Sequence, residues 1–461
     1  IEKLVYNAKG LQEKSYDANN NVTIFEYDKN GRLICTKDPE FNSSISSISH
    51  TTSQTYDNNG NVRTKTDGRG NTTSFVYDEM NRLVEVISPD WETNGKTVYT
   101  YDLNNNMLSQ TVGVTPSNAG ITTNFEYNAR NKMKSKGIGS ELIYYDYYPD
   151  GSLKSSTDRM NVKTTYKYNS HGWVTSIVTG VEGAEGTIKI SYPQDGYDKN
   201  GNVKKVSEEI IGSGGVKTTI TTEREYDELN RVTSKKETVT TGTVTTVVGP
   251  ATYEYDIVPN KNDINGMPDY CIAEKTVDPK SNVTVKIYDG LGRIKYVIDG
   301  DYVPGTPVTS YMTYNYYDTG NLQSVVYPNN YKEEYFYKKD NRLEKLINWK
   351  YDGKNLVKMD EYVYIYDGAD NIDTKKEKIN GSTTEIVTSY QYDSLNRLTN
   401  VNEQSKNRVT VYTFDPAGNR DTETITIIKG SNEEKTYRKY NYDLQNRLDY
   451  TVLRKTDANG A

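Results

Sequence analysis

The chain has 461 residues and a formal net charge of −7, from 56 Lys and Arg against 63 Asp and Glu. This mild acidity argues against a nucleic-acid-binding surface, which normally carries a basic excess. With two histidines and two cysteines, the sequence excludes a histidine-rich metal site, a four-cysteine zinc site and a dense disulfide framework. No apolar run approaches the roughly 18 residues of a membrane-spanning helix. We therefore expect no cofactor, no metal ion, no nucleic-acid partner and no membrane span.

Tyrosine dominates the aromatic residues, with 42 Tyr against 6 Phe and 3 Trp. Leaving Tyr out of the apolar count and adding Gly gives roughly 32% apolar residues, where globular chains reach about 45–50%. A compact aliphatic core is therefore not expected. Disorder is not expected either, because disordered chains have few aromatic residues. The composition indicates a surface-rich β-structure that packs mainly through tyrosine.

One motif recurs about 18 times along residues 1–461. It consists of Tyr, then Asp or Asn, two variable residues, Gly or Asn, then Arg, Asn or Lys, and finally Leu, Val or Met. Successive lead tyrosines follow one another in short steps, as from Tyr56 to Tyr77, or in longer ones, as from Tyr168 to Tyr197, and such self-similarity indicates a repeat array. We assign a structural role to the lead Tyr and to the fifth-position Gly or Asn of nine copies. They are Tyr27 and Gly31, Tyr56 and Gly60, Tyr77 and Asn81, Tyr168 and Gly172, Tyr197 and Gly201, Tyr226 and Asn230, Tyr288 and Gly292, Tyr392 and Asn396, and Tyr442 and Asn446.

Each copy predicts a β-hairpin. Aromatic and polar residues alternate before the lead Tyr, as in residues 166–168, which is the period of a strand with one aromatic face. The Asp side chain can accept backbone N–H bonds, and Gly or Asn tolerates a left-handed backbone, so a turn with positive φ at the fifth position follows. A second turn closes each repeat; it is led by Asp in residues 67–71 and rich in Gly in residues 212–215.

These signals predict an all-β chain of tandem hairpins that forms a spiralling β-sheet strip, without helical periodicity. Residues 256–280 interrupt the spacing and are expected to form an irregular insert. Tyr168, Tyr197 and Tyr226 are separated by identical steps, so they should occupy equivalent positions on successive hairpins. Repeats of unequal length, combined with the right-handed twist of strands, should make the strip coil.

The repeat resembles the YD repeats of rearrangement-hotspot (RHS) proteins. The likeness rests on Tyr-Asp-x-x-Gly-Arg-Leu, as in residues 27–33, and on the upstream sequence Asp-Gly-Arg-Gly-Asn-Thr-Thr-Ser-Phe-Val-Tyr of residues 67–77. Similar repeats occur in the cocoon components of bacterial Tc toxin complexes, in wall-associated contact-dependent toxins and in teneurins. The resemblance implies a long β-strip wound into a hollow shell, or part of one.

The resemblance also implies a function. RHS shells enclose a polymorphic toxin, whereas teneurin repeats belong to an extracellular adhesion module. We therefore expect a non-enzymatic shell segment of a secreted or cell-surface bacterial protein. Its partners would be a cargo or toxin polypeptide inside the shell and other parts of the full-length protein that cap the ends. The alternative is an adhesion or carbohydrate-binding module that contacts cell-surface glycans.

The chain also departs from RHS toxins. Neither their downstream core domain, which carries an aspartic autoprotease, nor a toxin is recognisable before Ala461. Asp-Pro pairs at residues 38–39, 278–279 and 415–416 lie in repeat turns, so no protease residue is carried over. The chain starts at Ile1, which we interpret as a fragment or a processed product. We assign no catalytic residue and treat the whole chain as one repeat array.

Some residues have a second interpretation. Asp/Asn-rich turns such as residues 57–61 are similar to calcium loops but lack the closing bidentate Glu, so a structural turn is favoured. His50 and His171 are expected at the surface, although a Ser-His-Asp triad assembled in space stays open. Cys35 and Cys271 are expected to be free, partly buried thiols, with a disulfide as the alternative. The tyrosines are expected to pack the strip against itself, with sugar-stacking platforms as the alternative.

Overall fold

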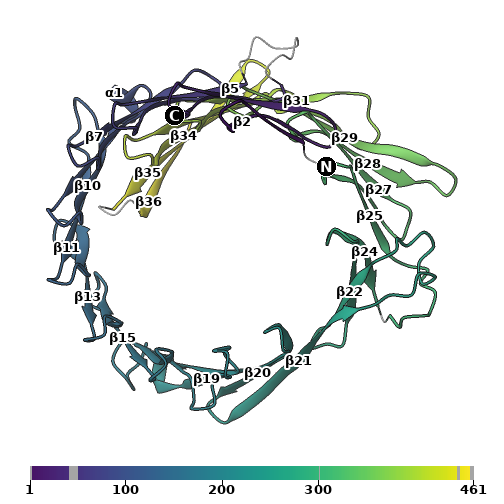
Figure 1. The fold of residues 1–461 in the computed structure, drawn as a ribbon, viewed down its shortest axis with the longest axis horizontal. Coiled ribbons are helices and arrows are strands. Elements are labelled where there is room, and N and C mark those ends of the chain that lie inside the picture. Colours follow the sequence, from purple (N-terminus) through teal and green to yellow (C-terminus); the bar gives the residue numbers. More distant parts are fainter. Residues whose placement is uncertain (1–2, 41–49, 301, 444–446, 457–461) are drawn as a thin grey trace. The chain divides into compact units, whose positions relative to one another are not determined.

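The computed structural model describes residues 3–40, 50–300, 302–443 and 447–456 (Figure 1). These residues form 36 β-strands, one α-helix of four residues and two short 3₁₀ helices. The predicted all-β class is therefore confirmed. The chain divides into two compact units, one made of residues 1–124 with 315–461 and the other of residues 125–314.

The first unit combines an early and a late segment of the chain. The early segment contains β1 (Lys3–Tyr6), β2 (Gln12–Tyr16), β3 (Val22–Tyr27), β4 (Leu33–Lys37), β5 (Thr51–Tyr56), β6 (Val62–Thr66), β7 (Thr72–Tyr77), β8 (Leu83–Ile87), α1 (Trp91–Asn94), β9 (Lys96–Tyr101) and β10 (Met107–Val114). The late segment contains β26 (Leu322–Val326), β27 (Lys332–Tyr337), β28 (Leu343–Tyr351), β29 (Leu356–Tyr366), β30 (Ile372–Lys378), β31 (Ile386–Tyr392), β32 (Leu398–Glu403), η2 (Gln404–Lys406), β33 (Arg408–Phe414), β34 (Arg420–Lys429), β35 (Asn432–Tyr442) and β36 (Leu448–Thr456).

The second unit continues the same pattern. Its strands are β12 (Met133–Ile138), β13 (Glu141–Tyr147), β14 (Leu153–Thr157), β15 (Lys163–Tyr168), β16 (Val174–Thr179), β17 (Ile188–Ser191), β18 (Lys205–Ile211), β19 (Lys217–Tyr226), β20 (Val232–Thr241), β21 (Val244–Ile257), β22 (Ile272–Val277), β23 (Val283–Tyr288) and β24 (Ile294–Asp299), with η1 (Ser213–Gly215) before β19. Strands β11 (Ile121–Tyr127) and β25 (Met312–Tyr316) contain the unit boundaries.

Strand pairing follows chain order. Within the described residues, each strand pairs antiparallel with the strand before or after it in the sequence, as β14, β15 and β16 show. Most lead tyrosines open their hairpins with the same bulge. Tyr168 pairs with Val174, whereas the preceding Lys167 pairs with Ser176, so Thr175 is the extra residue. Identical shifts recur at other lead residues of both units, including Tyr27, Tyr226 and Tyr392. Bulges increase local twist, so the motif itself builds twist into every repeat.

The longer repeats place their extra residues in the strands. Strands β19 and β20 have 10 residues each and β21 has 14, whereas β14 has 5 and β15 has 6. Hairpins of unequal length therefore occur along the strip, as the unequal steps between lead tyrosines predict.

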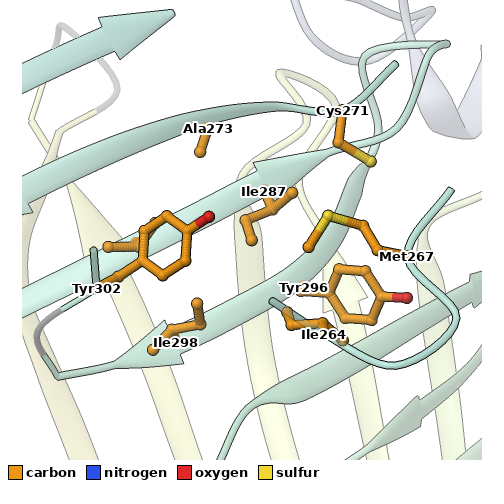
Figure 2. Close-up of a cluster of buried hydrophobic side chains, with 9 residues drawn as sticks. Ile264, Met267, Cys271, Ala273, Ile287, Tyr296, Ile298 and Tyr302 are labelled. Atoms are coloured by element: carbon orange, nitrogen blue, oxygen red, sulfur yellow. The ribbon is translucent and has the colours of Figure 1, made fainter. Parts of the chain in front are cut away.

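One small aliphatic core stands out in a chain whose strands are otherwise mostly half-buried. Ile264, Met267 and Cys271, from the segment between β21 and β22, cover Ala273, Val285, Ile287, Tyr296 and Ile298 of β22–β24, and Tyr302 closes the cluster (Figure 2). Ile264, Val285 and Ile287 have no exposed surface. The composition did not predict this core, because it uses few residues of a long chain.

The irregular segment is shorter than the sequence predicts. Asp256 and Ile257 end β21, and β22 already begins at Ile272, so residues 258–271 form the insert and not residues 256–280. Buried Asp263 fixes its shape, because its carboxylate accepts hydrogen bonds from Tyr302 Oη (2.7 Å), Gly305 N (2.9 Å) and Asn260 N (3.0 Å). Strand β22 contains no aromatic residue, so an alternation of aromatic and polar residues does not identify it in the sequence.

Helices are few and short in this fold. The sequence does not predict α1, since four residues are too few for a helical periodicity. None of the helices among the described residues has the length and apolar character needed to cross a membrane.

Candidate functional site: repeat turns and the seam between them

The Asp carboxylate organises each YD turn, the name used here for the turn that follows a lead Tyr. Asp28 Oδ1 accepts hydrogen bonds from the backbone N–H groups of Asn30 and Arg32, both at 2.9 Å, and Oδ2 accepts one from Arg32 Nε at 2.7 Å. The backbone bond from Arg32 is the largest cause that lowers the pKa of Asp28. Where Asn replaces Arg, as in the turn of Asp57, the amide of Asn61 fills the Oδ2 position at 2.9 Å. Both oxygens are thus used within the turn, which favours the structural interpretation over a calcium loop.

The fifth position of the turn has a left-handed backbone. Among the assigned residues, φ is 81° at Gly31, 93° at Gly60, 61° at Asn81, 79° at Gly172, 86° at Gly201, 62° at Asn230, 74° at Gly292 and 61° at Asn396. Asn446 lies outside the described residues. Side chains other than Asn and Asp are strained in this conformation. The Gly or Asn of the motif is therefore a backbone requirement of the turn.

Most lead tyrosines tie their repeat to the preceding one through the side-chain hydroxyl. The acceptor is usually the backbone carbonyl of the seventh motif residue one repeat earlier. Tyr56 Oη donates to Leu33 O at 2.7 Å, Tyr197 to Val174 O at 2.7 Å, and Tyr226 to Val203 O at 2.9 Å. Tyr288 differs, because its hydroxyl donates to Glu274 Oε2 at 2.8 Å. The recurring bond places Tyr197 and Tyr226 equivalently on successive hairpins.

The Arg of the motif ties its repeat to the following one. Its guanidinium lies over the next lead ring, at 4.4 Å for Arg32 over Tyr56 and for Arg231 over Tyr255, and at 4.9 Å for Arg342 over Tyr366. Where the motif has Asn, an amide contact between neighbouring turns takes its place. Asn61 Nδ2 donates to Asn81 Oδ1 at 2.9 Å, and Asn202 Nδ2 donates to Asn230 Oδ1 at 2.7 Å.

One repeat replaces both charged residues of this arrangement. In the turn after Tyr168, Asn169 and Trp173 stand where Asp and Arg are usual, and the Trp173 ring packs on Tyr197 at 5.1 Å. His171 is exposed, as expected, and stacks on Trp173 at 4.9 Å, while Tyr192 stacks on Tyr197 at 5.3 Å. The result is a column of four rings, without the usual Asp and Arg, that has His171 at one end.

The first unit contains a seam between its two segments. On one side lie the second turns of the early segment between β2 and β3, β6 and β7, and β8 and β9, together with Asp38, Glu40 and His50 between β4 and β5. On the other side lie the YD turns of the late segment. In Figure 1 these early strands (purple to blue) run beside the late ones (yellow-green) near the labels β5 and β31. The seam therefore joins two opposite kinds of turn that are about 300 residues apart in sequence.

Arg69 makes the most extensive contact across the seam. Its Nη1 donates to Asp393 O and to Asn396 Oδ1, and its Nη2 donates to Tyr392 O, each at 3.0 Å. Its Nε lies 3.7 Å from Asp367 Oδ2. Because two of the acceptors are backbone carbonyls, Arg69 recognises the shape of the YD turn and not only its side chains.

The next early turn continues the seam. Asn94 Nδ2 donates to Ser394 Oγ at 2.8 Å, and Asn94 Oδ1 accepts from Arg397 Nη2 at 2.9 Å. Gly113 lies so close to the late segment that a Cβ atom there would come within 2.8 Å of the backbone of Pro416 and Ala417. Backbone contact at this distance leaves room only for glycine.

His50 is buried, which contradicts the predicted surface position. Only 6% of the residue is exposed, and its Nδ1 lies 3.6 Å from Asp38 Oδ2 and 3.4 Å from Arg342 Nη2 of the late segment. Nearby, Glu40 Oε1 accepts a hydrogen bond from Lys339 N at 3.1 Å. His50 is therefore covered by residues of the late segment. The sequence around His50 could not predict this burial, because the covering residues follow about 300 positions later.

The two cysteines are free thiols, as predicted, so the alternative of a disulfide is wrong. Cys271 is buried in the second-unit core, and Cys35 is half-buried on β4 beside a seam cavity of about 450 Å³. Burial is the main cause that raises the pKa of both thiols. A raised pKa disfavours the thiolate form, so neither cysteine has the properties of a nucleophile.

The repeats and the fold have known counterparts. The family model described as RHS Repeat matches residues 56–90. The crystal structure of TcdB2-TccC3-TEV is 12% identical, with a TM-score of 0.56, over 98% of this chain and 26% of that one. A Tc holotoxin pore from Photorhabdus luminescens is 12% identical, with a TM-score of 0.55, over 99% of this chain and 24% of that one. This chain thus spans about a quarter of these structures' chains and shares their fold. No curated protein sequence matches it.

The hydroxyl bond of a lead Tyr can be tested by Tyr226→Phe. This change removes the bond to Val203 O but keeps the ring, so we expect the free energy of unfolding in urea to fall by about 1 kcal/mol. Tyr144→Phe is the control. Tyr144 is 48% exposed, and its hydroxyl makes no hydrogen bond within the part of the chain that the structure describes. Equal effects of the two substitutions would contradict the coupling of repeats through the lead Tyr.

The seam can be tested by Arg69→Ala. Loss of three hydrogen bonds from a guanidinium should destabilise the protein by about 1–3 kcal/mol and speed hydrogen exchange of the amides in residues 392–396. Arg63→Ala, an exposed site on β6, should change stability by less than about 0.5 kcal/mol. Unchanged exchange at residues 392–396 in the Arg69 variant would mean that the seam is not formed in solution.

Proposed function

We propose that this chain, which is made of RHS/YD repeats, is a wall segment of a shell that encloses a cargo or toxin polypeptide. The observation that carries the proposal is the seam of the first unit. There the YD turns of the late segment are bonded to the second turns of the early segment through Arg69, Asn94 and Glu40. When the turns of one segment are hydrogen-bonded to the turns of another segment, the two parts of the strip form one continuous surface.

The packing supports a wall in preference to a globule. Strands such as β4, β8 and β18 consist entirely of half-buried residues, so neither face of the sheet is fully covered. A compact domain of this size would bury one face against another layer. A wall one sheet thick has no second layer, and it gains its stability from contacts between neighbouring repeats.

The proposed partners follow from this role. A cargo polypeptide would lie against the inner face, and other parts of a longer protein would cap the open ends. The chain spans about a quarter of the structures that it resembles, which supports additional parts. We assign the protein to a secreted or cell-surface location in a bacterium, in line with its likeness to a Tc holotoxin pore.

We also propose that the segment has no enzymatic activity. The turn carboxylates, which are its most numerous acidic groups, are engaged by donors of their own turns, as Asp28 and Asp57 show. His171 stacks on Trp173, and buried His50 faces Asp38 and Arg342. These surroundings support structural roles.

The alternative, an adhesion or carbohydrate-binding module, has one observation in its favour. The column that ends in exposed His171 offers stacked aromatic rings near the surface, and aromatic faces stack on sugars. If this alternative holds, a glycan bound by the chain would be lost on Trp173→Ala. The shell proposal predicts no such glycan.

Small-angle X-ray scattering of the 461-residue chain tests the shell proposal. A wall that surrounds a cavity should give a hollow or crescent-shaped profile, with a radius of gyration clearly above the roughly 23 Å of a compact chain of this length. The same chain in concentrated urea provides the reference for unfolded material. A solid profile with the radius of a compact chain would leave no room for a cargo and would contradict the proposal.

A further inference from the structure

We propose that the outer edge of residues 244–248, at the beginning of β21, pairs with the same edge of a second copy of this chain and forms a two-fold symmetric dimer. These residues lie wholly within the second unit. The inference goes beyond the proposed shell and does not depend on a cargo, since both strands of the contact come from this chain.

The two sides of β21 are paired over different lengths. On one side, β20 pairs with β21 from Val244 to Thr252. On the other side, β22 pairs with it only from Thr252 to Ile257. Among the described residues, no strand pairs with the second side of residues 244–248. The backbone N–H and C=O groups on that side therefore form an open edge, which is a template for another strand.

The open edge is exposed and yet held in place. Val244 is 67% exposed and Val247 is 55% exposed. The hairpin that carries them is fastened by a hydroxyl hydrogen bond of 3.1 Å between Thr240 and Thr245. A second bond of 3.1 Å joins Thr241 to Thr218 of β19. Because the edge is already extended and paired on its inner side, a second strand can bind to it with little loss of conformational freedom.

This edge lacks the features that usually keep edge strands apart, which are charged side chains, Pro and bulges. Residues 238–253 contain no charged side chain. Gly249 and Pro250 follow the open edge and do not interrupt it. Val or Thr occupies every position of residues 244–248, and β-branched residues favour strand pairing.

Other long hairpins of the chain have charged ends. The end of the β28–β29 hairpin carries Lys350, Asp352 and Lys354, and the end of the β34–β35 hairpin carries Lys429 and Glu434. Charges at such positions disfavour edge-to-edge pairing. The uncharged end of the β20–β21 hairpin is therefore a local feature and not a general property of the repeats.

The order of the side chains favours the same edge as the partner. Antiparallel pairing centred on Thr246 places Val244 opposite Val248 of the second copy, and Thr246 opposite its own counterpart. Since alternate residues share a face, Val244, Thr246 and Val248 of both copies would form one continuous β-branched face. An acidic or basic partner would need an opposite charge on this edge, and the edge has none.

The contact is small, so we expect a weak and reversible dimer. Five residues on each strand bury less than the roughly 1,200 Å² at which stable interfaces begin. In sedimentation velocity, the average mass of the 461-residue chain should rise with protein concentration from that of one chain toward that of two. The pairing is closed by its two-fold symmetry, so the series should end at the dimer.

A charge exchange at Thr246 tests the pairing. Thr246→Lys places two like charges directly opposite each other and should weaken association at least tenfold. Thr246→Glu should do the same. An equimolar mixture of the two variants should associate again, because opposite charges then face each other. Both variants should melt at the temperature of the unmodified chain, since Thr246 is exposed.

Cysteine cross-linking tests the register. Residues opposite each other in an antiparallel pair have Cα atoms about 4.5–5.5 Å apart, which is within the range of a disulfide. Thr246→Cys should therefore give a disulfide-linked dimer under mild oxidation. Val244→Cys should not, because the two introduced cysteines would lie four residues apart along the strands. Cys35 and Cys271 are present in both variants and give the same background.

Val357→Lys is the matched control. Val357 is 46% exposed on β29, and the same new charge there should leave association unchanged. The proposal is overturned if the unmodified chain stays monomeric at all concentrations or forms assemblies larger than a dimer. It is also overturned if Thr246→Lys associates as before, if the mixture of Lys and Glu variants stays monomeric, or if Val357→Lys abolishes association.

Discussion

The bond between the Asp carboxylate of the YD turn and the backbone of its own turn is the constraint on which the rest of the structure depends. The Asp28 carboxylate accepts a hydrogen bond from the backbone N–H of Arg32, which follows the left-handed backbone of Gly31. It also accepts a hydrogen bond from Arg32 Nε, and this bond fixes the direction of the Arg32 side chain. That direction places the guanidinium over Tyr56 of the next repeat. A local turn thereby becomes a connection between repeats.

This connection explains how a sheet without a continuous apolar core stays folded. Where the motif has Arg, as at Arg32 and Tyr56, a connection adds a hydroxyl bond of about 0.5–1.5 kcal/mol and a cation–π contact of about 0.5–1 kcal/mol at a partly exposed site. The contributions are small, but they repeat along both units and depend only on neighbouring hairpins. The aliphatic core around Ile264 and Ile287 lies where the insert interrupts the regular spacing. There, buried apolar area replaces the connection that the motif no longer supplies.

The sequence alone predicts what is local. The turn, the positive φ at Gly60 or Asn230 and the strand with an aromatic face all follow from a few adjacent residues, and the structure has them. The seam could not be predicted in this way. His50 faces Arg342, which is 292 residues away, and Arg69 bonds Asn396, 327 residues away. In the sequence, Arg69 is a variable residue of an Asp-led turn, and no neighbouring residue indicates its contact with the late segment.

The most direct test of this account is a double-mutant cycle between Arg32 and Tyr56, with Arg32→Met and Tyr56→Leu as the single changes. The free energies of unfolding of the four proteins in urea give the interaction between two repeats, separate from what each residue does within its own turn. The account predicts a stabilising coupling of about 0.5–1 kcal/mol. Additive effects, with a coupling of zero within error, would show that the turns fold independently and would contradict it.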